Sequence, residues 1–235
     1  MAEVIIPGPE GRLEGRYHQS SIKRAPAAVV LHPHPQHGGT MNNKVAYNLY
    51  HQFANAGYSV LRFNFRGVGR SQGKYDEGVG ELADAAAALD WLQNETPDAG
   101  SYWVSGFSFG AWIAMQLLMR RPEIEGFVSI SPPAHKYDFS FLSPCPSPGL
   151  IVQGDADSVV DEEYVAKLVD KLVKQRRNGD SDIEYHVIAG ADHFFRERMN
   201  EMNKTILEYL LSKQEDSPKE KPVKRDRRRR QLPVV

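Results

Sequence analysis

The residues best suited to chemistry begin with a serine placed between two glycines. The segment Gly106-Phe107-Ser108-Phe109-Gly110 lies between a strand-like run, Tyr102–Ser105, and an apolar segment that begins near Ala111. A serine in that context is typical of a nucleophile elbow, a tight turn from strand to helix that exposes the hydroxyl. The turn needs glycine on both sides, because a side chain there would collide with a neighbouring strand or helix. The pattern predicts that Ser108 is a nucleophile.

A serine hydroxyl is a weak nucleophile, so it needs a histidine as base and a carboxylate that orients the histidine. Two later strand-like runs are followed by such groups. The run Gly149–Gln153 leads into Asp155 and Asp157. The run Ile183–Ile188 leads into Asp192 and His193. Because the carboxyl ends of parallel strands lie at one edge of a sheet, we expect these side chains near Ser108. Residue type alone does not choose among the three aspartates.

The loop that follows Ala27–Leu31 offers a different chemistry. His32, His34 and His37 have the H-x-H-x-x-H spacing of metal-dependent hydrolases of the metallo-β-lactamase type. Those proteins usually have an aspartate where this chain has Gln36, and further carboxylate ligands are not placed convincingly. Our main expectation is a protein with neither a metal nor an organic cofactor. A metal-dependent hydrolase that uses His32, His34 and His37 is kept as the less favoured alternative.

The elements that must position these groups alternate along the chain. Two short runs near Glu3–Ile6 and Arg12–His18 are predicted as edge strands. The later predicted strands are Ala27–Leu31, Tyr58–Phe65, Tyr102–Ser105, Gly126–Ile130, Gly149–Gln153 and Ile183–Ile188, and the predicted helices are Asn43–Ala56, Glu81–Gln93, Ala111–Arg120, Glu162–Gln175 and Arg198–Leu211. Strands that alternate with helices predict an α/β fold with a mostly parallel sheet and helices on both faces.

Composition and charge narrow the class of protein. The chain has 235 residues, of which 41% are hydrophobic and 25% charged, and it has one cysteine. It has no apolar run long enough to cross a membrane, and its N-terminus lacks the pattern of a secretory signal. A lone thiol suits a reducing compartment, so we expect a cytoplasmic protein.

The distribution of charge suggests two regions. Residues 213–235 contain nine Lys or Arg against four Asp or Glu, whereas the rest of the chain is mildly acidic. We expect one domain over residues 1–212, followed by a disordered basic tail over residues 213–235. A mildly acidic body does not favour nucleic acid as a partner.

Together these motifs resemble those of the α/β-hydrolase superfamily, and more closely its small bacterial members of the dienelactone-hydrolase type. The resemblance spans about residues 20 to 212 and rests on the segments Leu31–Pro35, Phe65–Ser71, Gly106–Gly110, Gly154–Val160 and Gly190–Phe195. It implies the α/β-hydrolase fold. Dienelactone hydrolases themselves use a cysteine where this chain has Ser108, so their substrate is not carried over.

The resemblance also implies roles for the candidate residues. It implies a triad of Ser108, His193 and Asp157, because the family's acid stands three positions after the glycine that ends the strand. It implies an oxyanion hole built from two backbone N–H groups. One belongs to Phe109, which follows the nucleophile. The other belongs to His34, since the two prolines that flank His34 have no N–H.

We therefore expect a carboxylesterase-like serine hydrolase that cleaves an ester or related acyl bond through an acyl-serine intermediate. About twenty-five residues separate Ser131 from Asp157, too few for a large lid, so a small acyl compound is the expected substrate. The alternative from another class is a non-catalytic protein of this fold that binds a ligand or partner. Neither a membrane nor a nucleic acid is an expected partner, and the oligomeric state is not indicated.

Overall fold

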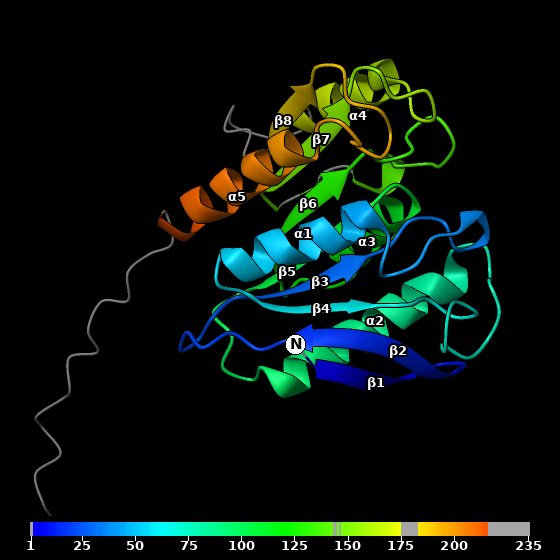
Figure 1. Ribbon diagram of the computed structural model, residues 1–235, viewed down its shortest axis with the longest axis vertical. Coiled ribbons are helices and arrows are strands. Elements are labelled where there is room, and N and C mark those ends of the chain that lie inside the picture. Colours follow the sequence, from blue (N-terminus) through cyan, green and yellow to red (C-terminus); the bar gives the residue numbers. More distant parts are fainter. Residues whose placement is uncertain (1, 143–144, 146, 175–182, 216–235) are drawn as a thin grey trace, which may run out of the picture.

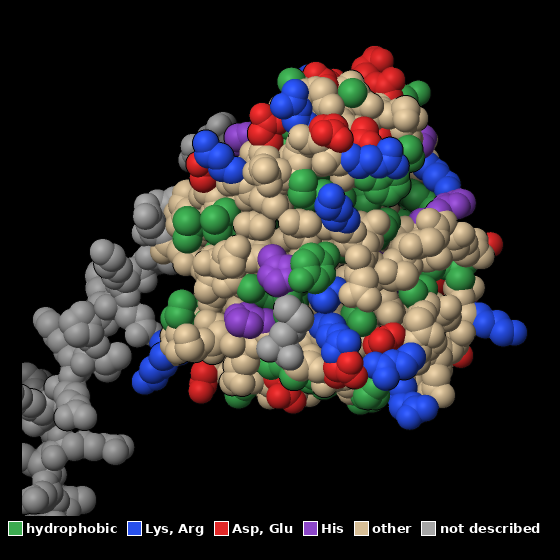
Figure 2. Space-filling view, viewed as in Figure 1, with side chains coloured by type: hydrophobic (Ala, Val, Ile, Leu, Met, Phe, Trp, Pro, Cys, Tyr) green, Lys and Arg blue, Asp and Glu red, His purple; other side chains and the backbone are tan. Residues whose placement is uncertain are grey.

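The computed structural model describes residues 2–142, 145, 147–174 and 183–215 (Figure 1). One eight-stranded sheet separates two layers of helices. This is the predicted three-layer α/β arrangement. On the face seen in Figure 2, the basic and acidic side chains of the described residues are interspersed.

The sheet is mostly parallel, as predicted. Its strands are β1 (Ala2–Gly8), β2 (Gly11–His18), β3 (Ala27–Leu31), β4 (Ser59–Phe63), β5 (Tyr102–Phe107), β6 (Ile124–Ile130), β7 (Gly149–Gly154) and β8 (Ile183–Ile188). Their spatial order is β1-β2-β4-β3-β5-β6-β7-β8. Strand β2 pairs antiparallel with both β1 and β4, and the other pairs are parallel. Of the two strands predicted at an edge, β1 lies there, whereas β2 lies one position inside.

Buried strands explain the continuous apolar runs of the sequence. Every residue of β3, β4 and β7 is buried. A strand covered on both faces has no polar side to alternate with, which explains the unbroken apolar run of β3. Strands β4 and β7 each include buried polar side chains, Ser59 and Arg62 in β4 and Gln153 in β7.

Five helices cover the sheet: α1 (Lys44–Asn55), α2 (Val79–Glu95), α3 (Phe109–Leu118), α4 (Glu162–Lys174) and α5 (Met199–Glu215). Helices α1 and α5 pack on one face and lie in front of the sheet in Figure 1, and α2, α3 and α4 pack on the other. Local signals set the ends of α1. The Asn43 side chain accepts hydrogen bonds from the N–H groups of Val45 and Ala46 at its start. Gly57, with φ of +88°, follows its end.

Helix α5 extends beyond the boundary expected at residue 212. Lys213 Nζ lies 3.3 Å from Glu184 Oε1, and Gln214 Nε2 donates a 2.7 Å hydrogen bond to the carbonyl of Ala56. The first residues assigned to the tail are therefore part of the folded domain, and the remainder of that prediction lies outside the described residues. None of the described helices combines the length and the apolar character needed to cross a membrane.

The connection between β6 and β7 decides how open the sheet edge is. Within its described residues, the only helix is a short 3-10 turn over Ser140–Leu142. The fold is thus an α/β-hydrolase fold without a large lid, and the loops after β3, β4, β5, β7 and β8 meet at the carboxyl edge of the sheet.

Candidate active site

Ser108 occupies the turn between β5 and α3, in a backbone conformation that residues other than glycine rarely adopt. Its φ is +53°. The flanking glycines explain how the turn is tolerated. A Cβ on Gly106 would overlap the backbone of Gly110 at the start of α3. A Cβ on Gly110 would meet the carbonyl oxygens of Leu31 and His32. Both collisions involve backbone, so the spacing of the motif reflects a real steric need.

His193 and Asp157 lie beside this serine. His193 Nε2 is 3.2 Å from Ser108 Oγ, and His193 Nδ1 is 2.7 Å from Asp157 Oδ2. His193 follows β8 and Asp157 follows β7, and both are buried. A carboxylate can only accept, so the imidazole proton lies on Nδ1 and the lone pair of Nε2 faces the serine hydroxyl. This arrangement can take a proton from the hydroxyl.

The Asp157 carboxylate is held on both of its oxygens. Oδ1 accepts hydrogen bonds from the N–H groups of Val159 and Val160, each 2.8 Å long, and Oδ2 also accepts one from Gln153. Burial on its own would raise the pKa of Asp157, but the hydrogen bonds from His193 and from these two N–H groups outweigh it and lower that pKa. Asp157 is therefore ionised at neutral pH and fixed in orientation.

Gln153 is a residue of the site that sequence reasoning did not single out. Its side chain is fully buried at the end of β7. The amide Nε2 donates to Asp157 Oδ2 at 3.1 Å and to the carbonyl of Val160 at 2.8 Å. The available signal was a glutamine at the end of an otherwise apolar strand.

The other two candidate aspartates have different partners. Asp155 Oδ1 accepts a 2.6 Å hydrogen bond from the N–H of Gly190, which ties the loop after β7 to the loop after β8. Asp192 Oδ1 accepts a 3.0 Å hydrogen bond from the N–H of Arg196. The structure thus brings Asp157 to His193 and leaves the carboxylates of Asp155 and Asp192 engaged elsewhere.

Two backbone N–H groups are available at the positions expected for an oxyanion hole. Phe109 is the first residue of α3, where the end of the helix carries partial positive charge. His34 precedes a short 3-10 helix over Pro35–His37. In the described part of the chain, neither N–H donates a hydrogen bond. The rings of the two residues lie 4.9 Å apart, so the loop after β3 and the start of α3 are adjacent.

The histidine loop does not fit the metal alternative. His32 is fully buried, its Nε2 accepts a 3.0 Å hydrogen bond from the N–H of Phe65, and its Nδ1 donates at 2.6 Å to the carbonyl of Pro33. Both ring nitrogens are therefore engaged, and burial lowers the pKa of His32 to about 4. Over the described ranges, no three or more His, Cys, Asp or Glu side chains gather as a metal site. The alternative of a ligand trio at His32, His34 and His37 is therefore not supported, because both ring nitrogens of His32 are engaged within the fold.

Comparison with known proteins places this site in a family. Residues 19–231 match the family described as X-Pro dipeptidyl-peptidase (S15 family). A protein of unknown function from Agrobacterium tumefaciens, described as a candidate α/β hydrolase, is 54% identical, with a TM-score of 0.87 over 94% of this chain and 100% of that chain. An α/β serine hydrolase homologue from Coxiella burnetii is 38% identical, with a TM-score of 0.79 over 88% and 96%. A Xanthomonas campestris protein, described as an α/β serine hydrolase without a lid, is 30% identical, with a TM-score of 0.80 over 89% and 93%.

Proposed function

The chain belongs to the X-Pro dipeptidyl-peptidase (S15) family within the α/β-hydrolase superfamily, and from this premise we propose that it is a serine hydrolase. Its substrate is a small compound with an ester or related acyl bond, which it cleaves through an acyl-serine intermediate. The observation that carries this proposal is the continuous series of hydrogen bonds from Ser108 through His193 to Asp157.

In the first half of the reaction, Ser108 Oγ attacks the carbonyl carbon of the substrate while His193 Nε2 takes the hydroxyl proton. Asp157 keeps the ring in the required tautomer and stabilises the imidazolium that forms. The carbonyl oxygen becomes an oxyanion, which accepts hydrogen bonds from the N–H groups of Phe109 and His34. His193 then gives its proton to the departing alcohol, and the acyl group remains on Ser108.

In the second half, water replaces the alcohol. His193 takes a proton from the water, whose oxygen attacks the acyl-serine carbonyl, and the same two N–H groups stabilise the second oxyanion. Return of the proton to Ser108 Oγ releases the carboxylic acid and restores the enzyme. Every proton in this cycle passes through His193 Nε2, so neither a metal nor an organic cofactor is required.

Two observations favour small substrates. The described residues between β6 and β7 include only one short helix, and the Xanthomonas campestris relative is described as lacking a lid. An open site buries little of a long acyl chain, so binding a lipid there would gain little hydrophobic free energy.

Hydrolysis of peptides is the second candidate, because the description of the matched family names a dipeptidyl-peptidase. Both candidates use the same nucleophile and differ in the leaving group. A panel of p-nitrophenyl esters of increasing acyl length, run beside dipeptide p-nitroanilides that end in proline, separates them. We expect the short esters to have the highest kcat/KM.

The test of the serine mechanism is covalent labelling. A fluorophosphonate probe should label the wild-type protein, and Ser108→Ala should abolish both labelling and turnover without changing the melting temperature by more than a few degrees. Ser20→Ala is the matched control, because the Ser20 hydroxyl accepts a hydrogen bond from the N–H of Ile22, in a turn away from Ser108 and His193. Undiminished labelling in Ser108→Ala would refute the mechanism, and a wild-type protein that is neither labelled nor active would favour a non-catalytic binding role.

A further inference from the structure

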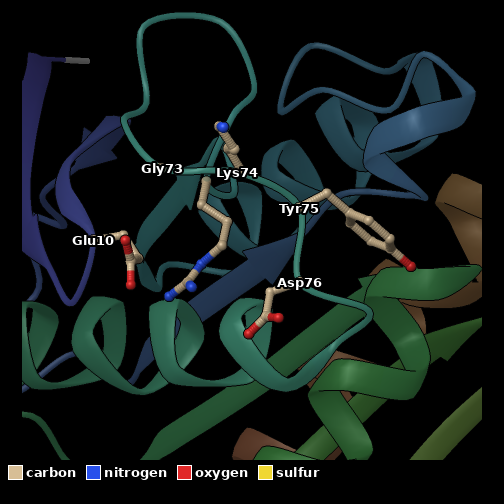
Figure 3. Close-up of a pocket in the computed structure, with 6 residues that line it drawn as sticks. Glu10, Gly73, Lys74, Tyr75 and Asp76 are labelled. Atoms are coloured by element: carbon tan, nitrogen blue, oxygen red, sulfur yellow. The ribbon is translucent and has the colours of Figure 1, made fainter.

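The loop between β4 and α2, residues 64–78, brings Tyr75 to the proposed oxyanion hole. Its ring centre lies 5.1 Å from that of His34 and 6.1 Å from that of Phe109, the two residues with available N–H groups. Figure 3 shows Tyr75 pointing away from Glu10 and Asp76, with which it lines a surface pocket. Its ring therefore lies next to the two residues of the proposed oxyanion hole, on the side away from Glu10 and Asp76.

Hydrogen bonding fixes the direction of the Tyr75 hydroxyl proton. The N–H of Gln36 donates to His34 Nδ1 at 3.2 Å, so this nitrogen carries no proton. Burial, with the nearby charges of His37 and Lys136, lowers the pKa of His34 to about 4, so the ring is neutral and its proton lies on Nε2. That nitrogen lies 3.2 Å from Tyr75 Oη and donates to it.

The phenol oxygen therefore accepts from His34, and its own proton points elsewhere. Among the described residues, Tyr75 Oη has no further hydrogen-bond partner, although the side chain is half-buried. Burial also raises the pKa of Tyr75, so the hydroxyl keeps its proton in the range where the enzyme would work. The hydroxyl therefore has a donor to which none of the described residues offers an acceptor, on a ring that lies beside those of His34 and Phe109.

The order of the strands indicates which part of a substrate lies there. In the sheet, β4 and β3 lie on one side of β5, and β7 and β8 lie on the other. His193 must give its proton to the leaving group, so the leaving group lies on the β8 side of Ser108. The acyl part is then left on the side of the loops that carry His34 and Tyr75.

We propose that Tyr75 determines acyl specificity by donating its hydroxyl hydrogen bond to an oxygen in the acyl part of the substrate. The preferred substrates are esters whose acyl group carries an ether, hydroxyl or carbonyl oxygen near the scissile bond. A site built to hydrogen-bond such an oxygen discriminates against the analogue that lacks it. This inference rests on the proposed serine hydrolase activity.

The test uses two substrates of the same shape. The acyl groups of p-nitrophenyl methoxyacetate and p-nitrophenyl butyrate differ only by an oxygen in place of a methylene. The measured quantity is the ratio of their kcat/KM values. Tyr75→Phe removes the hydroxyl alone, and we expect it to lower this ratio about five- to tenfold, the effect of one hydrogen bond. Tyr47→Phe, on the exposed side of α1, is the matched control and should leave the ratio unchanged.

Two results would overturn the inference. An unchanged ratio in Tyr75→Phe would mean that the hydroxyl makes no contact with the acyl oxygen. An equal fall for both substrates would mean that Tyr75 acts only by holding His34 in place. Failure of the proposed function is recognised separately, because Ser108→Ala would then hydrolyse both esters as fast as the wild-type protein.

Discussion

At the scale of single residues, Asp155, Asp157 and Asp192 all lie near Ser108 in the fold and differ in what their carboxylates contact. Replacing Asp157 by Asn removes the acceptor that holds the His193 proton on Nδ1, and the ring then favours the wrong tautomer. We expect Asp157→Asn to lower kcat on the order of a thousandfold or more. Steady-state kinetics with short p-nitrophenyl esters, corrected for folded fraction, measure this loss.

Asp155→Asn and Asp192→Asn are the matched controls, since both carboxylates accept hydrogen bonds from backbone N–H groups, those of Gly190 and Arg196. We expect them to act through stability, with a chemical step within a few fold of the wild-type rate. A near-normal rate in Asp157→Asn beside a collapse in either control would reassign the acid.

A second residue-scale prediction concerns His32. Its pKa is about 4 in the folded protein against an ordinary value near 6.5, so between these values the unfolded chain binds more protons. Stability is therefore full above pH 6.5 and falls as the pH drops toward 4, by up to about 1.4 kcal/mol per pH unit. Urea unfolding from pH 8 to pH 4.5 should show this slope. The slope should become shallower in His32→Gln, where His34, whose pKa is also about 4, still contributes. It should stay unchanged in the exposed-site control His186→Gln. A slope in His32→Gln equal to that of the wild-type protein would exclude His32 as a source.

The sequence predicted only some of these residues, for a physical reason. The glycines around Ser108, and the strands before Asp157 and His193, are local signals that a linear pattern carries. Gln153 has only a weak signal, a polar residue at the end of an apolar strand, although its partners Asp157 and Val160 are close in sequence. Tyr75 has no local signal, because its partner His34 comes from a distant segment that the fold brings near. His32 also depends on a distant partner. Its Nε2 accepts a hydrogen bond from the N–H of Phe65, a contact that the sequence does not predict and that leaves this nitrogen unavailable to a metal.

At the scale of elements, the close contact between α3 and β3 depends on one glycine. A Cβ on Gly110 would meet the carbonyl oxygens of Leu31 and His32, and backbone atoms have little freedom to move aside. We expect Gly110→Ala to cost about 3 kcal/mol, the upper end of the typical range for overpacked cores, and to lower activity by shifting the elbow. Thermal unfolding and ester hydrolysis measure both effects.

Gly38→Ala provides the contrast for that variant. Gly38 has φ of +76°, but nothing lies within 4 Å of an added Cβ. Its cost should be limited to the backbone conformation, about 1–2 kcal/mol. Similar losses in the two variants would show that the contact of α3 with β3 adapts more easily than its backbone atoms suggest.

The predicted elements match the observed ones in type and order, but their ends differ by a few residues. Apolar periodicity locates the middle of a helix well. Apolar periodicity says little about the last turn of a helix, because the exposed residues there do not follow an apolar pattern. Helix α5 illustrates this, because Lys213 and Gln214 look like the start of a basic tail in sequence and contact Glu184 and Ala56 in the fold.

At the scale of the whole molecule, the end of α5 gives a direct test of the domain boundary. Truncation after Glu215 removes residues 216–235, and we expect esterase rate and melting temperature to stay unchanged. Truncation after Leu211 also removes the contacts of Lys213 and Gln214. It should cost about 1–2 kcal/mol, or a few degrees in melting temperature. A large loss of stability in the variant that ends after Glu215 would mean that the removed residues 216–235 pack on the domain.

The order of the strands in the sheet could not be predicted from the sequence. Strand β4 precedes β5 along the chain, yet β3 lies between them. Alternation of strands and helices predicts a parallel sheet but leaves open which strands are neighbours. That order places the loop of Tyr75 beside the loop of His34.

The strand order has a consequence for how such an enzyme can diverge. The proposed proton transfer uses the loops after β7 and β8, and the proposed oxyanion hole uses His34 from the loop after β3. The β4–α2 loop supplies none of these groups, yet its Tyr75 lies beside His34. Substitutions in that one loop can therefore change the preferred substrate while the groups that carry out the reaction stay in place, and a chimaeric protein made by swapping only the β4–α2 loop would test this.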